Sequence, residues 1–250
     1  MLKGKIIITT QSSSGAQKMM DAFRSAGAFV YHLPTIETKT IFYTKDFIDQ
    51  HILIPDFSWF VFTSKKGVKG FFDNIRCHFP QFNLADYGKI AVIGEATARE
   101  LQSYEVVPDY INPGEDGNSL AAALANELLS PEDRVLFLAG NLAPDTLEKH
   151  ISEICEFKRI NIYETKYSLI QDKDVAALIH GDKADMIIFS SPSSFYGFLH
   201  FFGNKKNLNF AAIGNTTADV IKKCGFQVKA VAARPNPGAM VDAVLDYLKQ

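Results

Sequence analysis

The sequence lacks the features that mark proteins of membranes or of nucleic acids. No run of about 18 apolar residues is present, so no segment is expected to span a bilayer. Lys and Arg number 26 against 28 Asp and Glu, and the formal net charge of −2 gives no general attraction to nucleic acid or to an anionic membrane surface. We therefore expect neither of these as a partner.

Cysteine is also scarce, and its spacing carries no motif. The three cysteines, Cys77, Cys155 and Cys224, lie far apart, and no Cys-x-x-Cys is present. A reduced, cytoplasmic protein is the simplest interpretation. The opening MLKGKIIITT has only a short apolar stretch after its lysines, so we expect a first strand there and not a signal peptide.

The common cofactor and hydrolase motifs are missing as well. The sequence holds no G-x-G-x-x-G, no G-x-x-x-x-G-K-[ST] and no G-x-S-x-G, and its six histidines include no pair spaced i, i+4. Dinucleotide, nucleoside-triphosphate and metal sites therefore lack support. We expect no cofactor and no metal, which leaves a cofactor-free reaction or simple binding.

What the sequence does contain is a regular alternation of strand-like and helix-like segments. Several strand-like runs are continuously apolar, as parallel strands covered on both faces are. The helical segments keep apolar residues at i, i+3, i+4 and i+7. This pattern predicts an α/β fold with parallel sheets. The expected strands are 5–10, 28–33, 58–63, 89–93, 134–139, 185–191, 210–213 and 227–232, and the clearest helical stripes are 16–23, 68–75, 195–202 and 241–248.

Two stretches occur twice. AVIGEATAREL (91–101) matches AAIGNTTADVI (211–221), and SWFVFTSKKGVKGFF (58–72) matches DMIIFSSPSSFYGFL (185–199). A fainter match links KIIITTQ at 5–11 with RVLFLAGN at 134–141. Chance similarity between two α/β units is the alternative, but hydroxyl residues recur at equivalent strand ends. We infer two copies of one α/β unit.

The repeated hydroxyls stand where helices begin after strands. Ser64 corresponds to Ser191, and Thr97 to Thr217. Each hydroxyl could simply cap its helix. However, the carboxyl ends of parallel strands are also where α/β folds bind ligands, and helix N-termini attract carboxylates and phosphates. A ligand with several anionic groups would suit such a set, and Lys65 adds positive charge to the first of them.

Six motifs in order resemble the uroporphyrinogen-III synthase family. They are FTSKKGVKGFF, AVIGEATARELQ, VLFLAGNLAPDTL, INIYET, IIFSSPSSFYGFL and AAIGNTTADVIKKCGFQV. The resemblance implies two flavodoxin-like domains with parallel sheets, joined by a two-stranded linker, with the active site in the cleft between them. It also implies interleaving: residues 1–35 with 168–250 form one domain, 45–160 form the other, and 36–44 and 161–167 are linker strands.

The resemblance further implies the activity of a cofactor-independent hydro-lyase. The family closes hydroxymethylbilane, a linear tetrapyrrole with several carboxylates, to uroporphyrinogen III, with loss of water and inversion of the last pyrrole through a spiro intermediate. Tyr163 in INIYET matches the tyrosine that assists loss of hydroxide, although it could also be a linker tyrosine packed on the core. The residues implied to bind substrate carboxylates, through side chains that face the ligand or through backbone amides, are Ser64, Lys65, Thr97, Ser191, Thr216 and Thr217.

Two departures keep other functions open. The family often has arginine where this sequence has Thr10 and Ala139, and a guanidinium is a strong carboxylate ligand. A catalytically silent relative that binds a tetrapyrrole or another polyanion is therefore the main alternative. A binding protein of the periplasmic type is a third, which the expected absence of a signal peptide disfavours. The family's habit makes a monomer the expected state.

Overall fold

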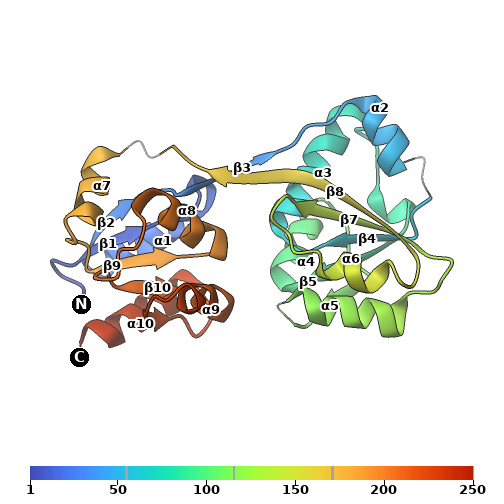
Figure 1. Cartoon of the computed structure of the whole chain (residues 1–250). Helices are drawn as coiled ribbons and strands as arrows, with labels where there is room; N and C mark the ends of the chain where they lie inside the picture. The colour runs from blue at the N-terminus through green and yellow to red at the C-terminus, as the bar shows by residue number, and fades with distance from the viewer. Residues whose placement is uncertain (54–55, 115, 170–171, 250) are drawn as a thin grey trace. The chain divides into compact units, whose positions relative to one another are not determined.

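The chain divides into two compact units. The computed structural model describes residues 1–53, 56–114, 116–169 and 172–249. Unit 1 comprises Met1–Thr38 and Lys166–Gln250, and unit 2 comprises Lys39–Thr165. The chain therefore leaves unit 1, completes unit 2 and returns, and the course of each unit can be followed by colour in Figure 1.

Unit 1 is built on a parallel sheet whose two faces are covered by helices (Figure 1). Among the described residues the strand order is β11 (Val228–Val231), β10 (Phe210–Ala212), β9 (Met186–Phe189), β1 (Ile6–Thr9) and β2 (Phe29–His32). One hydrophobic cluster joins a sheet face to α1 (Ser13–Ser25) and α10 (Pro237–Leu248). Another joins the opposite face to α7 (Lys173–His180), α8 (Pro192–Phe202) and α9 (Asn215–Lys223).

Unit 2 repeats this three-layer arrangement. Its sheet has the order β3 (Ile36–Thr40), β8 (Glu156–Tyr167), β7 (Arg134–Gly140), β4 (Trp59–Phe62), β5 (Lys89–Ile93) and β6 (Tyr110–Asn112) in the described part of the chain. One face packs against α2 (Lys45–Ile48), the π-helical turn Asp49–Leu53, α3 (Lys65–His78) and α4 (Gly94–Gln102). The other face packs against α5 (Gly117–Ala123), the π-helical turn Leu124–Leu128 and α6 (Thr146–Ile151).

Continuous apolar runs form the central strands, because helices cover both faces of each sheet. All four residues of β4 and all four of β9 are buried. Each of the eight predicted strands overlaps an observed strand, and each predicted helical stripe lies within a helix. The segments that were not predicted are β6 and the helices α2, α5, α6 and α7. Strands β3 and β8 are neighbours, and each crosses the boundary between the units.

The order of the strands explains the repeated sequences. The sequence matches pair β1 with β7, β4 with β9 and β5 with β10. With this pairing, the order β2-β1-β9-β10-β11 of unit 1 is equivalent to the order β8-β7-β4-β5-β6 of unit 2. Each copy of the repeat therefore gives two strands to one sheet and three to the other, so the copies follow one another in the sequence while the two units are interleaved.

Candidate functional site

Tyr163 lies next to a β-bulge in β8. Strands β7 and β8 pair in regular register up to Ala139 and Asn161, after which Gly140 pairs with Tyr163 and the register skips Ile162. Side chains alternate between the faces of a strand, so without the bulge Ile162 and Tyr163 would point to opposite faces. Instead both pack against the hydrophobic cluster that includes α3. The bulge thus aims Tyr163 at α3.

The Tyr163 hydroxyl meets the first turn of that helix. It lies 3.1 Å from the hydroxyl of Ser64, and either oxygen can be the donor. Ser64 is the N-cap of α3, where its Oγ accepts a hydrogen bond of 3.1 Å from the backbone N–H of Gly67. When Ser64 donates to Tyr163, the phenol O–H remains available to a further acceptor. The hydrogen bonds then run from the positive end of the helix, through Ser64, to the phenol.

A glycine makes room for the phenol ring. A Cβ built on Gly140 would lie 2.3 Å from Cε2 of Tyr163 and 2.7 Å from its hydroxyl oxygen. Real Cβ atoms do not approach other atoms so closely, so any larger residue at 140 would displace the ring. Gly140 therefore fixes the depth at which Tyr163 sits against the sheet.

Positive charge lies beside this hydroxyl pair. Lys65 is the first residue of α3 and is exposed. One turn later Lys69 pairs with Asp73 at 2.7 Å, and the hydrogen bond that Lys69 donates to Asp73 raises the pKa of Lys69. The start of α3 thus combines a helix N-terminus, an exposed ammonium group and two hydroxyls.

Unit 1 carries an equivalent helix start without a phenol. Ser191 caps α8 by accepting from the N–H of Ser194, with nearly the same backbone angles as Ser64. Gly70 of α3 lies against the carbonyl of Ile162, and Gly197 of α8 lies against the carbonyl of Thr35. Ile36, which follows Thr35, therefore holds the place that Tyr163 holds in unit 2.

The structure corrects the expectation for two threonines. Thr97 in α4 and Thr217 in α9 are only 4% and 3% exposed, so their side chains are buried and do not face a ligand, although this was expected of them. They lie on the helix face that packs on the sheet, as do the neighbouring Ala98 and Ala218. Thr216, by contrast, is exposed.

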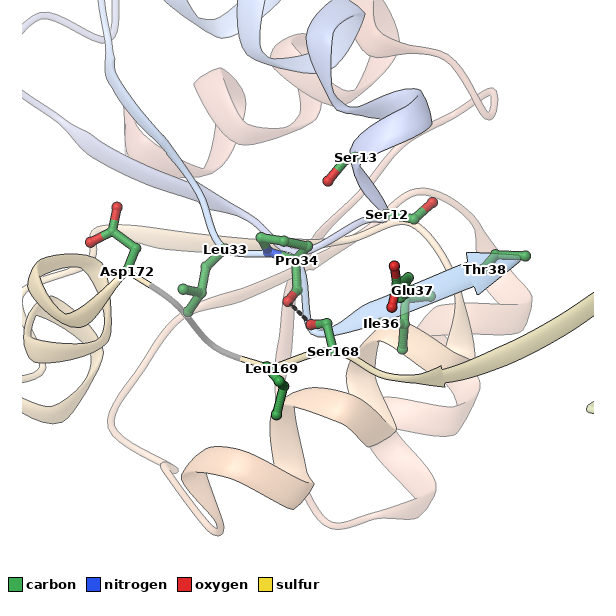
Figure 2. A pocket seen from close by; sticks show the side chains of 10 residues that line it. All are labelled: Ser12, Ser13, Leu33, Pro34, Ile36, Glu37, Thr38, Ser168, Leu169 and Asp172. Atoms are coloured by element: carbon green, nitrogen blue, oxygen red, sulfur yellow. Dashed lines mark hydrogen bonds between the residues drawn. The ribbon is translucent and has the colours of Figure 1, made fainter. Parts of the chain in front are cut away.

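A cavity of about 480 Å³ lies in unit 1, at the carboxyl ends of β1 and β2 (Figure 2). Ser12 and Ser13 at the start of α1 form one part of its wall, and Leu33 and Asp172 lie at another (Figure 2). Ser168 donates a hydrogen bond to the carbonyl of Pro34 within it. The remaining lining residues are Ile36, Glu37, Thr38 and Leu169. Its position fits the usual ligand edge of a parallel sheet.

Neither a metal-binding cluster nor a membrane-spanning helix is present among the described residues. No group of three or more His, Cys, Asp or Glu side chains there is arranged to hold a metal ion. In the same part of the chain, no helix is long and apolar enough to cross a membrane.

Comparison with known proteins decides the family. A family model described as uroporphyrinogen-III synthase HemD matches residues 17–242. The chain belongs to the uroporphyrinogen-III synthase family. This confirms the predicted family.

Relatives match along nearly the whole chain. The porphyrin biosynthesis protein HemD of Ruminiclostridium josui is 26% identical over 98% of this chain, which spans about half (49%) of that longer protein. The uroporphyrinogen-III synthase of Chlorobaculum parvum is 22% identical, with 98% of this chain and 100% of that protein covered.

Solved structures show the same fold. A mutant uroporphyrinogen-III synthase from Thermus thermophilus matches with a TM-score of 0.71 at 15% identity, over 98% of this chain and 99% of that one. The Helicobacter pylori uroporphyrinogen-III synthetase gives 0.69 at 21% identity, over 97% and 99%. The predicted α/β fold with parallel sheets is confirmed.

The two departures from the family pattern have structural roles here. Thr10 is buried, and its hydroxyl donates to the carbonyl of Ile188 on the neighbouring strand. Ala139 is buried in the core of unit 2. A guanidinium does approach the loop after it, since Arg159 donates to the carbonyls of Gly140 and Ala143 at 2.8 and 3.0 Å. Arg159 therefore supports the loop that follows β7. The N–H groups that make these hydrogen bonds are not available to a substrate carboxylate.

The structure brings together Tyr163, Ser64 and Lys65 in unit 2, while Ser191, Thr216 and Thr217 belong to unit 1. Gly140, the bulge and the cavity of unit 1 were not predicted from the sequence. One signal for the cavity was available, because Ser12 and Ser13 follow the first strand as Ser64 follows β4.

Proposed function

We propose that this chain closes hydroxymethylbilane to uroporphyrinogen III, with loss of one water and inversion of the last pyrrole ring. The observation that carries the proposal is the 3.1 Å contact between the hydroxyls of Tyr163 and Ser64 at the start of α3. It provides a proton donor beside the positive end of a helix and the exposed Lys65. Membership of the family supports the choice of reaction.

In the first step, Tyr163 donates its proton to the hydroxyl of the substrate's terminal hydroxymethyl group. The C–O bond breaks as the lone pair of the adjacent pyrrole nitrogen moves into the ring, and water leaves. A phenol suits this task because phenols keep their proton at neutral pH. The O–H of Ser64 and the N-terminus of α3 stabilise the phenolate. The proton released when the macrocycle closes restores the phenol.

Substrate carboxylates bind, in this proposal, at helix starts that follow parallel strands. Lys65 and the first N–H groups of α3 serve one carboxylate, and Ser191 and Thr216 mark the equivalent places on α8 and α9. Because Thr97 and Thr217 are buried, their contribution is to pack the helix, and the backbone N–H groups of α4 and α9 make the contact.

The location, the oligomeric state and the use of a cofactor are further parts of the proposal. The two compact units are two domains that act on one small-molecule substrate, in a cytoplasmic monomer that needs no cofactor. Sedimentation equilibrium tests the oligomeric state, and exhaustive dialysis against a chelator tests the cofactor. Loss of turnover that returns on adding a metal ion would contradict cofactor independence.

A second candidate function is binding of a tetrapyrrole or another polyanion without catalysis. The absence of arginine at Thr10 and Ala139 favours it, because two strong carboxylate ligands are missing. It predicts saturable binding of the substrate or product with no change in the rate or the isomer of ring closure.

One assay separates the two candidates. Purified protein is mixed with freshly made hydroxymethylbilane, and the uroporphyrinogen isomers are separated and measured. Uncatalysed closure gives isomer I, so accumulation of isomer III in proportion to the amount of protein supports the synthase. Isomer I at the uncatalysed rate, together with binding, would support the silent relative.

A further inference from the structure

Asn141 lies beside Tyr163 in the sheet and has no part in the proposed proton transfer. Strand β7 ends at Gly140, whereas β8 continues past Tyr163 to Tyr167. Asn141, the next residue after β7, takes over the pairing. Its main-chain N–H donates to the carbonyl of Tyr163 at 3.2 Å. Its side-chain Oδ1 accepts from the N–H of Thr165 at 2.7 Å, and its Nδ2 donates to the carbonyl of Thr165 at 3.2 Å.

The side chain of Asn141 thus imitates the backbone of one further strand residue. Only a side-chain amide offers a donor and an acceptor together at this reach, since a carboxylate can only accept and a serine hydroxyl is shorter. These hydrogen bonds to Thr165 lie on the carboxyl-terminal side of Tyr163 in β8, and the bulge at Ile162 lies on its amino-terminal side.

The position of the bulge matters because it sets the face of the sheet to which Tyr163 points. A slip of one residue in β8 would carry Tyr163 to the opposite face of the sheet, away from Ser64. On the β7 side of β8, pairing after the bulge continues through Gly140 and Asn141, while β3 lies along the other side of β8. Asn141 itself lies at the surface and does not belong to a hydrophobic core cluster, so its substitution leaves core packing intact.

We propose that Asn141 is a positioning residue: its side-chain amide holds the strand after the bulge, so that the Tyr163 hydroxyl stays on Ser64. The inference rests on the proposed role of Tyr163 as proton donor. It predicts that loss of the Asn141 side chain acts on the reaction only through the Tyr163 hydroxyl.

A double-mutant cycle tests this directly. Rates of isomer III formation at saturating substrate are measured for the native chain, Asn141→Ala, Tyr163→Phe and the double variant. We expect Asn141→Ala to lower kcat about tenfold, with KM changed less than about twofold, because a misplaced donor affects the chemical step. In the Tyr163→Phe background the same substitution should change kcat by less than about twofold. An equal loss in both backgrounds, or no loss in the native one, would overturn the proposal.

Two variants complete the set. Asn141→Asp keeps the acceptor for Thr165 and loses the donor, so its kcat should lie between those of the native chain and Asn141→Ala. Asn83→Ala is the matched control, because Asn83 is also an exposed asparagine whose side chain makes two hydrogen bonds, to Ala85 and Asp86. Its kcat should equal that of the native chain.

A measurement without turnover separates this inference from the proposed function. In protein labelled with ¹³C on the tyrosine rings, Tyr163→Phe assigns the Tyr163 signal. That signal should shift in Asn141→Ala and stay in place in Asn83→Ala. If Tyr163→Phe has the native rate, the proposed catalytic role fails, and the NMR shift still decides whether Asn141 positions the ring. An unshifted Tyr163 signal in Asn141→Ala would overturn the positioning role itself.

Discussion

At the scale of single residues, Gly140 and Tyr163 form a matched pair on neighbouring strands. The ring of Tyr163 occupies the space that a side chain at 140 would need, with only 2.3 Å between a Cβ at 140 and ring atom Cε2. Tyr163 could be proposed from its resemblance to a family motif. The need for glycine could not, because it arises from a register shift between β7 and β8 that no local pattern in either strand reveals.

Substitution of Gly140 by alanine should therefore damage the site more than the fold. We expect Gly140→Ala to reduce isomer III formation at least tenfold, since the ring must move away from Ser64, and to lower the free energy of unfolding by about 1–3 kcal/mol through overpacking. Gly117→Ala is the control: a Cβ there meets no atom within 4 Å, and activity should be unchanged. A fully active Gly140→Ala would show that the ring position is unimportant.

Asp133 gives a pH-dependent test of stability in unit 2. Burial alone would raise the pKa of Asp133, but hydrogen bonds from Ser58 (2.6 Å) and Ser130 (2.7 Å) outweigh it and lower the pKa. A carboxyl whose pKa is lower in the folded state stabilises the fold above its unfolded pKa of about 3.9, and this contribution is lost as the pH falls through the folded value.

We expect Asp133→Asn to lower the free energy of unfolding by about 1 kcal/mol at pH 7, and the gap to the native chain to close at an acid pH where Asp133 is protonated in both the folded and the unfolded state. Urea unfolding at both pH values measures this. The exposed Asp219→Asn should stay within about 0.5 kcal/mol of the native chain throughout. A gap of the same size at both pH values would show that the charge of Asp133 is not involved.

At the scale of elements, two helices begin in the same way but have different neighbours. Ser64 and Ser191 each cap a helix after a fully buried strand, and each accepts from the N–H three residues later. Ser64 also contacts Tyr163, whereas Ser191 contacts Ser193 at 3.0 Å. The sequence predicted both helix starts from the repeat. It did not predict which hydroxyl would contact a phenol, because that partner comes from a strand about 100 residues away in the chain.

Removal of the two capping hydroxyls should therefore affect stability equally and activity differently. Ser64→Ala and Ser191→Ala should each lower the free energy of unfolding by about 1 kcal/mol, the usual cost of losing a cap. Ser64→Ala should also lower kcat roughly tenfold by releasing Tyr163, while Ser191→Ala should act mainly on KM. Steady-state kinetics and urea unfolding on the same preparations measure both. Equal kcat values for the two variants would remove Ser64 from the site.

Long apolar runs and clear helical stripes predicted the central elements correctly, because burial on both faces leaves a strong pattern. The elements that were not predicted leave a weaker pattern of apolar residues in the sequence. β6 has only three residues, and α6 and α7 have six and eight. Short elements depend on their neighbours for stability, so periodicity in one sequence carries little information about them.

At the scale of the whole molecule, the repeated sequences and the equivalent strand orders of the two sheets both reflect one duplication. Each copy begins in one sheet and ends in the other, which places matching motifs on equivalent strands of different units. The sequence alone suggested two contiguous halves, and only the family resemblance suggested interleaving. The physical reason is that which strands pair is a long-range property, invisible to a comparison of the two copies. The duplication also provides two similar helix starts, of which one contacts a tyrosine.

The central claim is that the Tyr163 hydroxyl delivers the proton that releases water from the substrate. Its most direct test is the rate of isomer III formation by Tyr163→Phe, compared with the native chain and with Tyr247→Phe, which removes a hydroxyl bonded to Asn209 in unit 1. Loss of one general acid should slow the reaction by about 10²-fold, while isomer III remains the enzymatic product. Tyr247→Phe should keep the native rate. A native rate of isomer III formation with phenylalanine at 163 would contradict the account.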